Sequence, residues 1–411
     1  MRFEIHREFP RFGNPPRGGA IATRSTDPGE WRKRPPLPGA ESLRTAARTL
    51  PAILLLALSG CTAVSPSTFC PEDAAGRTDS GYSPFTSIPK GRVGAMPCPG
   101  PFTFYVSADP GKLGTHAYSS ALPVANGETA RGIVYTLHGG FIDIAHLRKA
   151  ADWTAYHQVR FRHALEEGRK CMVLPGKEGG SYHISFRYPS SWSGMDAAEK
   201  KAVMDELSVR LAQRLAIVQT EWHEIATWYG YSSTPFPEKQ SAFTYDDPVS
   251  HMVGTKVAGM ALRKGSGNYD ASVTWFLKQE LDRLGAVSPA ETERAIAVVK
   301  DKWWHNGQML HRQLDIGSTD GEVRPWIVPG FPNGKTMAGE VFRVPTLDPV
   351  SGQDFRNFAQ VEIDPGLSAW RNMRRVLPGN PDRCRPAEHF PILMAHIRQA
   401  EEMPPSPRTT R

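Results

Sequence analysis

The sequence contains little cysteine, and it has no apolar stretch long enough to cross a bilayer. Five cysteines occur in 411 residues, and they do not form the two close pairs that a zinc ribbon requires. The apolar run at residues 49–57 is much shorter than the roughly 20 residues that span a membrane. A zinc ribbon is therefore excluded, and the apolar run has to be explained in another way.

An excess of charge of one sign is also missing once the first residues are set aside. The net charge of the whole chain is +7. Residues 1–60 contain ten Lys and Arg against five Asp and Glu, whereas residues 61–411 contain 39 against 37. This near-equality of basic and acidic residues argues against a surface that binds nucleic-acid phosphates. With 40% apolar and 22% charged residues, the composition is that of a folded globular protein.

Residues 44–60 have the order of features expected of a bacterial lipoprotein signal peptide. Two arginines precede the short apolar core, which ends in Leu58-Ser59-Gly60-Cys61. This ending resembles the lipobox, in which a lipid is attached to the cysteine and cleavage occurs just before it. Cys61 is thus the predicted lipidation site and membrane anchor. Because Thr62 rather than an aspartate follows, we expect the protein to lie on the outer membrane and to face the periplasm.

The composition divides the chain into four parts. Residues 1–60 form the targeting region, and their first part, rich in Arg, Pro and Gly, reflects either a start codon placed too far upstream or an extended signal-peptide start. Residues 61–100 are expected to be a tether leading into an irregular lobe. The main globular domain is predicted over 101–400, and a disordered tail over 401–411.

Cleavage before Cys61 would leave four further cysteines. These are Cys70, Cys98, Cys171 and Cys384. Because the periplasm is oxidising, an even number of cysteines predicts disulfides. Three pairings are possible. Cys70 and Cys98 bracket a segment rich in Gly, Ser and Pro that a disulfide would hold together, so the preferred pairs are 70–98 and 171–384.

Apolar periodicity predicts an α+β protein, namely a helix-dominated single globular domain with small β-hairpins or a small sheet. Helices are predicted over 144–167, 196–229, 247–263, 269–284, 288 to about 304, and 387–401. Strands are predicted over 102–106, 132–137, 323–328 and 360–363, and a hairpin is predicted from 170–174 with 181–188.

The first candidate site lies where the helix at 144–167 begins. Asp143 is a suitable N-cap, and His146 starts a helical face that is otherwise apolar. A buried neutral histidine there would act as a base or a metal ligand. The alternative is a core histidine bonded to backbone. Asp143 and the Gly139-Gly140 pair crowd the same corner, which supports the functional interpretation.

The second candidate site is a pair of glutamates on the helix at 196–229. Glu221 and Glu224 lie in one helical row between Ile217 and Trp228, so both are expected to be partly buried. They would serve as acid–base partners or as ligands, or they would form salt bridges to an arginine such as Arg148 or Arg214. His223-Glu224 also begins the motif His-Glu-x-x-His, but Thr227 stands in the place of its second histidine, which excludes a zincin.

The third candidate site is the segment 241–251. Asp247-Pro248 predicts an N-cap followed by a proline in the first helical turn, which leaves Asp246 available as a metal ligand. His251 points away from the apolar row of this helix, toward Gly254 and other small residues. Their small size predicts the close approach of another element.

Three blocks of these residues resemble a known family. They are Gly140-Phe-Ile-Asp143-x-x-His146-x-Arg148, Glu224-x-x-Thr227-Trp228 and Ser241-Ala-Phe-Thr. Together they are similar to an uncharacterised bacterial lipoprotein family, the domain of unknown function 4056, over roughly residues 95–385. The resemblance implies a location in the cell envelope, and it does not imply an activity.

Two hypotheses for the function follow. The first is a lipoprotein of the outer membrane that acts as a metal-assisted or acid–base hydrolase on an envelope component. Its catalytic residues would be His146, Asp143, Glu221 and Glu224, and the ligands of a divalent metal would be His146, Glu224 and Asp246. The second is a non-catalytic envelope protein that binds another lipoprotein or peptidoglycan, the latter by stacking on Trp303, Trp304, Trp326 and Tyr182. Convergence of the metal ligands in one cleft would favour the first.

Overall fold

The computed structural model describes residues 107–116, 132–176, 178–233, 237–265, 267–305, 308–318 and 320–402. Contacts divide the chain into Met1–Thr62 and Ala63–Arg411, and every described residue belongs to the second unit. The predicted signal peptide, Cys61, Cys70, Cys98 and the strand at 102–106 therefore lie outside the described residues. None of the described helices combines the length and the apolar character that a membrane crossing requires.

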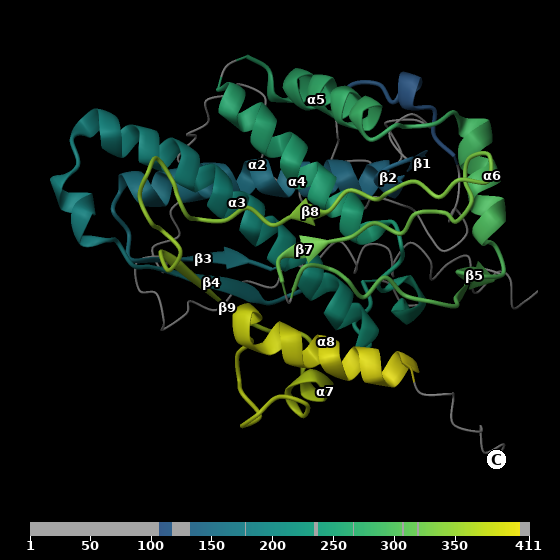
Figure 1. Cartoon of the computed structure of the whole chain (residues 1–411). Helices are drawn as coiled ribbons and strands as arrows, with labels where there is room; N and C mark the ends of the chain where they lie inside the picture. The colour runs from purple at the N-terminus through teal and green to yellow at the C-terminus, as the bar shows by residue number, and fades with distance from the viewer. Residues whose placement is uncertain are drawn as a thin grey trace, which may run out of the picture. The chain divides into compact units, whose positions relative to one another are not determined.

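Three long helices form the centre of this unit (Figure 1). Helix α2 (Ile144–Glu166) packs along both α3 (Ala197–Trp228) and α4 (Asp247–Lys264). The apolar face predicted for α2 is buried, including Ala150, Phe161 and the imidazole of His157. Because α2 has a neighbour on two sides, it is buried around most of its circumference, which an amphipathic surface helix would not be.

Shorter helices and small antiparallel sheets surround the three central helices. The other α-helices are α5 (Tyr269–Arg283), α6 (Pro289–Val299), α7 (Trp370–Arg374) and α8 (Pro386–Glu402), and the 3-10 helices are η3 (Pro110–Lys112), η5 (Ser190–Gly194) and η6 (Lys239–Ser241). The strands are β1 (Ile133–Thr136), β2 (Gly140–Asp143), β3 (Cys171–Pro175), β4 (Ser181–Phe186), β5 (Trp304–His305), β6 (Gln308–Met309), β7 (Glu322–Val323), β8 (Phe342–Arg343) and β9 (Ala359–Asp364). They form the sheets β1-β2, β3-β4-β9, β5-β6 and β7-β8. The predicted helix-dominated α+β class is confirmed.

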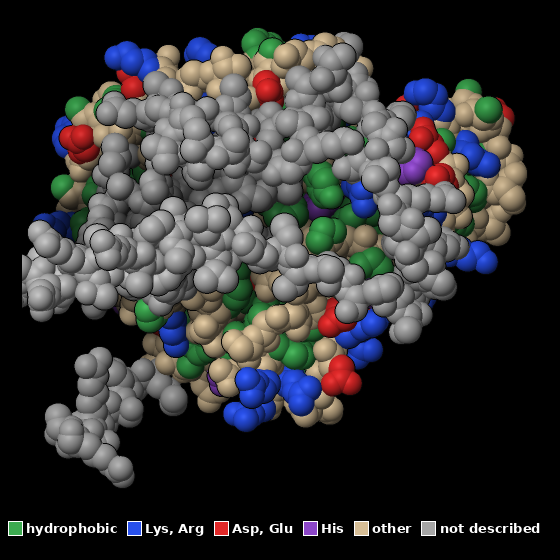
Figure 2. Space-filling view, turned by 180° about the vertical axis from the view of Figure 1, so that it is seen from behind, with side chains coloured by type: hydrophobic (Ala, Val, Ile, Leu, Met, Phe, Trp, Pro, Cys, Tyr) green, Lys and Arg blue, Asp and Glu red, His purple; other side chains and the backbone are tan. Residues whose placement is uncertain are grey.

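Most predicted helix boundaries agree with the structure to within one residue, as comparison with α2, α3, α4, α5 and α8 shows. The helix opening at Ser288 is shorter than predicted. It ends at Val299 because Lys300 leaves the helical conformation and Asp301 has a φ of 61°. Charged side chains of both signs lie next to one another along the margin of the face seen in Figure 2, in keeping with the balanced composition.

The hairpin β1-β2, of which only the first strand was predicted, delivers Asp143 to the start of α2. Its turn depends on Gly140, which has a φ of 68°. Any other residue at this position would have its Cβ only 2.5 Å from the carbonyl oxygen of Trp326. The Thr136 hydroxyl accepts a hydrogen bond from Gly139 N and donates one to Gly140 O, at 3.0 and 3.1 Å. Ile133 pairs with Asp143 across the hairpin, so the turn sets where α2 begins.

The predicted close approach at Gly254 is confirmed. A Cβ on Gly254 would lie 2.2 Å from the carbonyl oxygen of Leu147 and 2.9 Å from Cβ of Ala150. Helices α2 and α4 are therefore in contact through their backbones, a distance that only glycine permits at this position.

The predicted pairing of Cys171 with Cys384 is wrong. Cys384 is a free, fully buried thiol, and its backbone forms a bridge with Ile363 of β9. Cys171, which begins β3, is disulfide-bonded, so its partner is another residue. Sequence spacing could not show that Cys384 belongs to the core, where it packs as a small apolar side chain.

Gly254→Ala is expected to destabilise the fold by about 1–3 kcal/mol, the usual cost of overpacking. This is opposite to the gain of about 1 kcal/mol that alanine brings to an unhindered helix position. Chemical denaturation measures the change in the free energy of unfolding. Gly194→Ala is the control, since a Cβ there meets nothing within 4 Å. A Gly254→Ala variant as stable as the parent would show that α2 and α4 are not in backbone contact.

Candidate functional site

Asp143 performs two tasks at the start of α2. Its Oδ1 accepts hydrogen bonds from the backbone N–H groups of Ala145 and His146, at 2.6 and 3.2 Å, and so caps the helix as predicted. Its Oδ2 lies 2.9 Å from Nδ1 of His146. The carboxylate thereby holds the imidazole at the first turn of the helix, facing the start of α4.

The start of α4 lies against the same corner. Asp246, not Asp247 as predicted, occupies the N-cap position, and its side chain makes no capping bond. Asp247 is the first helical residue, and its Oδ1 lies 3.2 Å from Nδ1 of His146. The prediction misplaced the cap by one residue because both members of an Asp-Asp pair before proline are suitable caps. It therefore missed Asp247 as part of the site.

Ser250 connects the two helix starts. Its hydroxyl accepts a hydrogen bond from Asp143 N at 2.8 Å and donates one to the Asp246 carbonyl oxygen at 2.6 Å. Ser250 is fully buried, so water does not compete for these bonds. These two hydrogen bonds hold the backbone at Asp143 close to the backbone at Asp246.

As a result, Asp143, His146 and Asp246 converge. Each offers one potential ligand atom, and these three atoms all lie within 4.8 Å of one another. Two carboxylates and an imidazole at that separation are suited to a divalent cation. Two of the three predicted metal ligands, His146 and Asp246, are in this group. Glu224 is not, and Asp143 is there instead.

Glu224 lies next to the cluster rather than within it. It is buried, and its Oε2 accepts a hydrogen bond of 2.6 Å from Phe243 N. Phe243 has a φ of 59°, a strained value for a bulky residue. Burial and the nearby Asp247 carboxylate raise the pKa of Glu224 to about 8, although His146 and Lys149 act in the opposite direction. Glu224 can therefore gain or lose a proton near neutral pH.

The charges of the cluster are strongly coupled. Burial alone would lower the pKa of His146, but the Asp247 and Asp143 carboxylates outweigh it and raise the value to about 10. Burial would raise the pKa of Asp143, yet its hydrogen bonds and the charge of His146 lower it. Burial and the neighbouring Asp247 and Asp143 raise the pKa of Asp246 well above its usual range. The cluster thus retains protons where carboxylates in water would have lost them.

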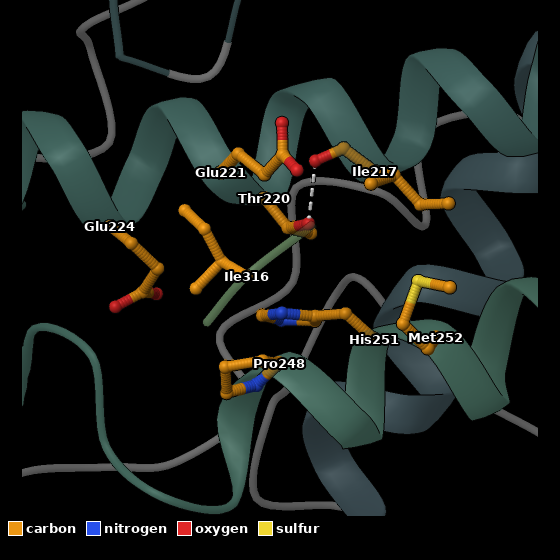
Figure 3. A pocket seen from close by; sticks show the side chains of 8 residues that line it. All are labelled: Ile217, Thr220, Glu221, Glu224, Pro248, His251, Met252 and Ile316. Atoms are coloured by element: carbon orange, nitrogen blue, oxygen red, sulfur yellow. Dashed lines mark hydrogen bonds between the residues drawn. The ribbon is translucent and has the colours of Figure 1, made fainter. Parts of the chain in front are cut away.

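Two adjoining pockets flank this cluster. The first, with an empty space of about 260 Å³, is lined by Glu221, Glu224 and His251 among others. Figure 3 shows the His251 ring pointing from α4 into the space below α3, with the Glu224 carboxylate on the other side of Ile316. The second, of about 340 Å³, is lined by His146. Thr220 and His251 line both, so His146 and the glutamates face neighbouring pockets rather than one.

Glu221 and Arg148 have separate surroundings. Burial raises the pKa of Glu221 to about 8, and the charge of Arg214 offsets this effect only in part. Arg148 donates hydrogen bonds to the carbonyl oxygens of Leu113 and Thr115 and so holds the segment 107–116 against α2.

Lys149 and Ser250 were not found by sequence reasoning. Lys149 is 8% exposed and acts electrostatically on both His146 and Glu224. Lys149 follows Arg148 directly in the sequence, and such a basic pair is usually exposed on a helix, so its burial gave no sequence signal. Ser250 gives no sequence signal, because its role arises from the contact between two helices.

One comparison with known proteins identifies the family. The family model described as "Protein of unknown function (DUF4056)" matches residues 84–315. This chain belongs to that family. No curated protein and no solved structure matches it.

The DUF4056 match ends earlier than the expected 385. It covers α2 to α6 and contains Asp143, His146, Glu224, Asp246 and Asp247. Strands β7 to β9 and helices α7 and α8 follow it. Every member of the cluster is therefore part of the DUF4056 segment, whereas the third strand of the sheet β3-β4-β9 comes from outside it.

Glu221→Gln is expected to flatten the pH dependence of stability. A folded-state pKa of about 8 favours the protonated carboxyl. Its contribution is therefore complete below the unfolded value near 4.5 and is lost as the pH rises through 8. The parent should lose up to about 1.4 kcal/mol per pH unit more than the variant in this window. Denaturation curves at several pH values measure the slope, with exposed Glu402→Gln as the control. Equal slopes for parent and Glu221→Gln would contradict the burial of this carboxyl.

Proposed function

We propose that this DUF4056 protein is a divalent-cation-dependent hydrolase, anchored to the outer membrane and acting on a component of the cell envelope. The observation that carries the proposal is the convergence of Asp143, His146 and Asp246, whose ligand atoms lie within 4.8 Å of one another at the starts of two helices. Three protein ligands leave coordination positions for water and substrate, as in catalytic rather than structural metal sites.

The charge balance around these residues favours a cation. Asp143, Asp246, Asp247 and Glu224 supply four carboxyl groups, whereas His146 and Lys149 are the basic side chains that act on them. Asp247 Oδ1 is buried and has no hydrogen-bond partner among the described residues, only the ionic contact with His146. A bound cation would replace the shared protons and offset the cost of burying these carboxylates.

The remaining groups have complementary roles in such a reaction. A cation held by Asp143, His146 and Asp246 would lower the pKa of a bound water and so provide a nucleophile. Glu224, with a pKa of about 8, would accept a proton from that water and return it to the leaving group. Glu221 forms the wall of the adjoining pocket beside Arg214. The predicted roles of His146, Asp143 and Glu224 are part of this proposal, whereas Glu221 has no catalytic role in it.

The envelope address rests on the sequence. The apolar core before Leu58-Ser59-Gly60-Cys61 supports export and lipidation at Cys61. The alternative function, a non-catalytic protein that binds peptidoglycan or another lipoprotein, is less well supported. Tyr182 is fully buried, and Trp303, Trp304 and Trp326 pack against a core cluster, so they contribute to the interior rather than to an exposed sugar-binding surface.

Asp246→Asn is expected to weaken cation binding by at least tenfold, because one of the charged ligands becomes neutral. Calorimetric titration of chelator-treated protein with Mn²⁺ and Zn²⁺ measures the affinity. Asp246 makes no side-chain capping bond, so the variant should fold. Asp282→Asn on the surface of α5 is the control and should bind as the parent does. Absence of cation binding by the parent would leave the non-catalytic alternative.

Cys61→Ser is expected to leave an unprocessed precursor without lipid, because the lipobox thiol is the acceptor. Metabolic labelling with palmitate in a bacterial host, followed by gel mobility, measures both properties. Cys98→Ser should be labelled and processed normally. Labelling that persists in the Cys61→Ser variant would refute the lipoprotein address while leaving the proposed metal site untouched.

A further inference from the structure

The second pocket has buried hydrogen-bonding groups that no other described residue satisfies. It lies between α2, α3 and the β3-β4 hairpin, and its empty space, counted together with the solvent at its mouth, is about 340 Å³. Tyr182 and Gln219 line it and are 1% and 5% exposed. The Tyr182 hydroxyl and Gln219 Nε2 have no hydrogen-bond partner among the described residues. Such groups are rare in folded proteins because each costs free energy.

Both groups can donate toward a ligand in the pocket. Gln219 Oε1 is fixed by His157, whose Nε2 lies 2.7 Å away. The amide NH₂ of Gln219 is therefore the group that can donate a hydrogen bond to a ligand. The Tyr182 hydroxyl comes from β4, whereas the Gln219 amide comes from α3. Two donors from different elements that face one cavity are suited to a ligand that has two acceptor oxygens.

The charge of the pocket indicates the ligand's sign. Lys149 lines the pocket and is 8% exposed. Glu178 lines it too, and its Oε1 lies 3.0 Å from Nδ1 of His223, with which it forms a hydrogen bond. A lysine ammonium and two neutral donors are suited to an anionic group with two acceptor oxygens. A phosphate, with nearly two charges, would bring a second charge next to Glu178. Trp153 supplies an apolar wall.

We infer that the pocket bounded by Lys149, Tyr182 and Gln219 binds the carboxylate of a short peptide or N-acyl amino acid. The ammonium of Lys149 would pair with the carboxylate, and the Tyr182 hydroxyl and the Gln219 amide would each donate to one of its oxygens. His146 lines the same pocket, so a carboxylate held there places the neighbouring amide bond beside the proposed metal ligands. Only this last link, that the ligand is also the substrate, rests on the proposed function.

The binding experiment compares a carboxylate with its neutral counterpart. Chelator-treated full-length protein is titrated with N-acetylglycine, N-acetylglycinamide and inorganic phosphate, and ligand-observed NMR gives each Kd. The carboxylate is expected to bind at least tenfold more tightly than the amide and more tightly than phosphate. Equal affinity for the carboxylate and the amide, or a preference for phosphate, would overturn the inference.

Tyr182→Phe tests the site by removing one hydroxyl and keeping the ring. The Kd for N-acetylglycine should rise about tenfold, as expected for a lost hydrogen bond to a charged group. The melting temperature should stay the same or rise, because an unpaired buried hydroxyl is removed. Tyr229→Phe is the matched control. Its hydroxyl bonds Nδ1 of His396 at 2.8 Å, so this variant should melt earlier and keep the parent's Kd.

Lys149→Gln removes the charge and should weaken carboxylate binding further while leaving the weak amide binding unchanged. An unaltered Kd in both Tyr182→Phe and Lys149→Gln would refute the assignment. The two proposals fail separately. Carboxylate binding is measured without metal, and cation binding is measured without carboxylate, so the loss of one result leaves the other in place.

Discussion

The close contact between α2 and α4 is the constraint on which the rest of the site depends. Gly254 lets the backbone of α4 approach the Leu147 carbonyl, where a Cβ would lie 2.2 Å from it. One turn earlier, Ser250 bonds both Asp143 N and the Asp246 carbonyl oxygen. With both contacts in place, the two helices begin side by side. A wider spacing would separate His146 from Asp247 and leave the acidic residues as two ordinary helix starts.

That arrangement also explains how so many carboxyl groups are tolerated in a buried place. Asp143, Asp246 and Asp247 all lie at helix N-termini, where the backbone N–H groups and the helix dipole stabilise negative charge. Asp143 benefits directly, through two backbone hydrogen bonds and a lowered pKa. The Asp246 side chain makes no capping bond, and burial together with the neighbouring Asp247 and Asp143 carboxylates raises its pKa. The stabilisation is therefore uneven, and the shortfall lies beside His146, where a cation would have the greatest effect.

The features that depend on local sequence were predictable, and those that depend on tertiary contact were not. The helices and the cap at Asp143 follow from periodicity and from the preference of aspartate for N-caps, both of which act within one turn. The burial of Glu221 and Glu224 followed from their row between Ile217 and Trp228. By contrast, the contact of Asp247 with His146, the pairing of β4 with β9 between Ser181 and Asp364, and the free thiol of Cys384 join segments distant in sequence. No spacing within one segment encodes them.

Helix α3 contributes different side chains to the two pockets. Glu221 and Glu224 project from it into the first pocket, whereas Gln219 projects into the second, and Thr220 lines both. Within residues 219–224 of α3, carboxyl groups that exchange protons near neutral pH thus line one pocket, and a hydrogen-bond donor lines the other. On the proposed function, this asymmetry would orient a substrate, because Lys149 and the donors Tyr182 and Gln219 line the second pocket and not the first. The bond to be hydrolysed would then extend past His146 and His251 toward Glu224. On the proposed function, α3 would therefore determine the orientation of the substrate as well as its position.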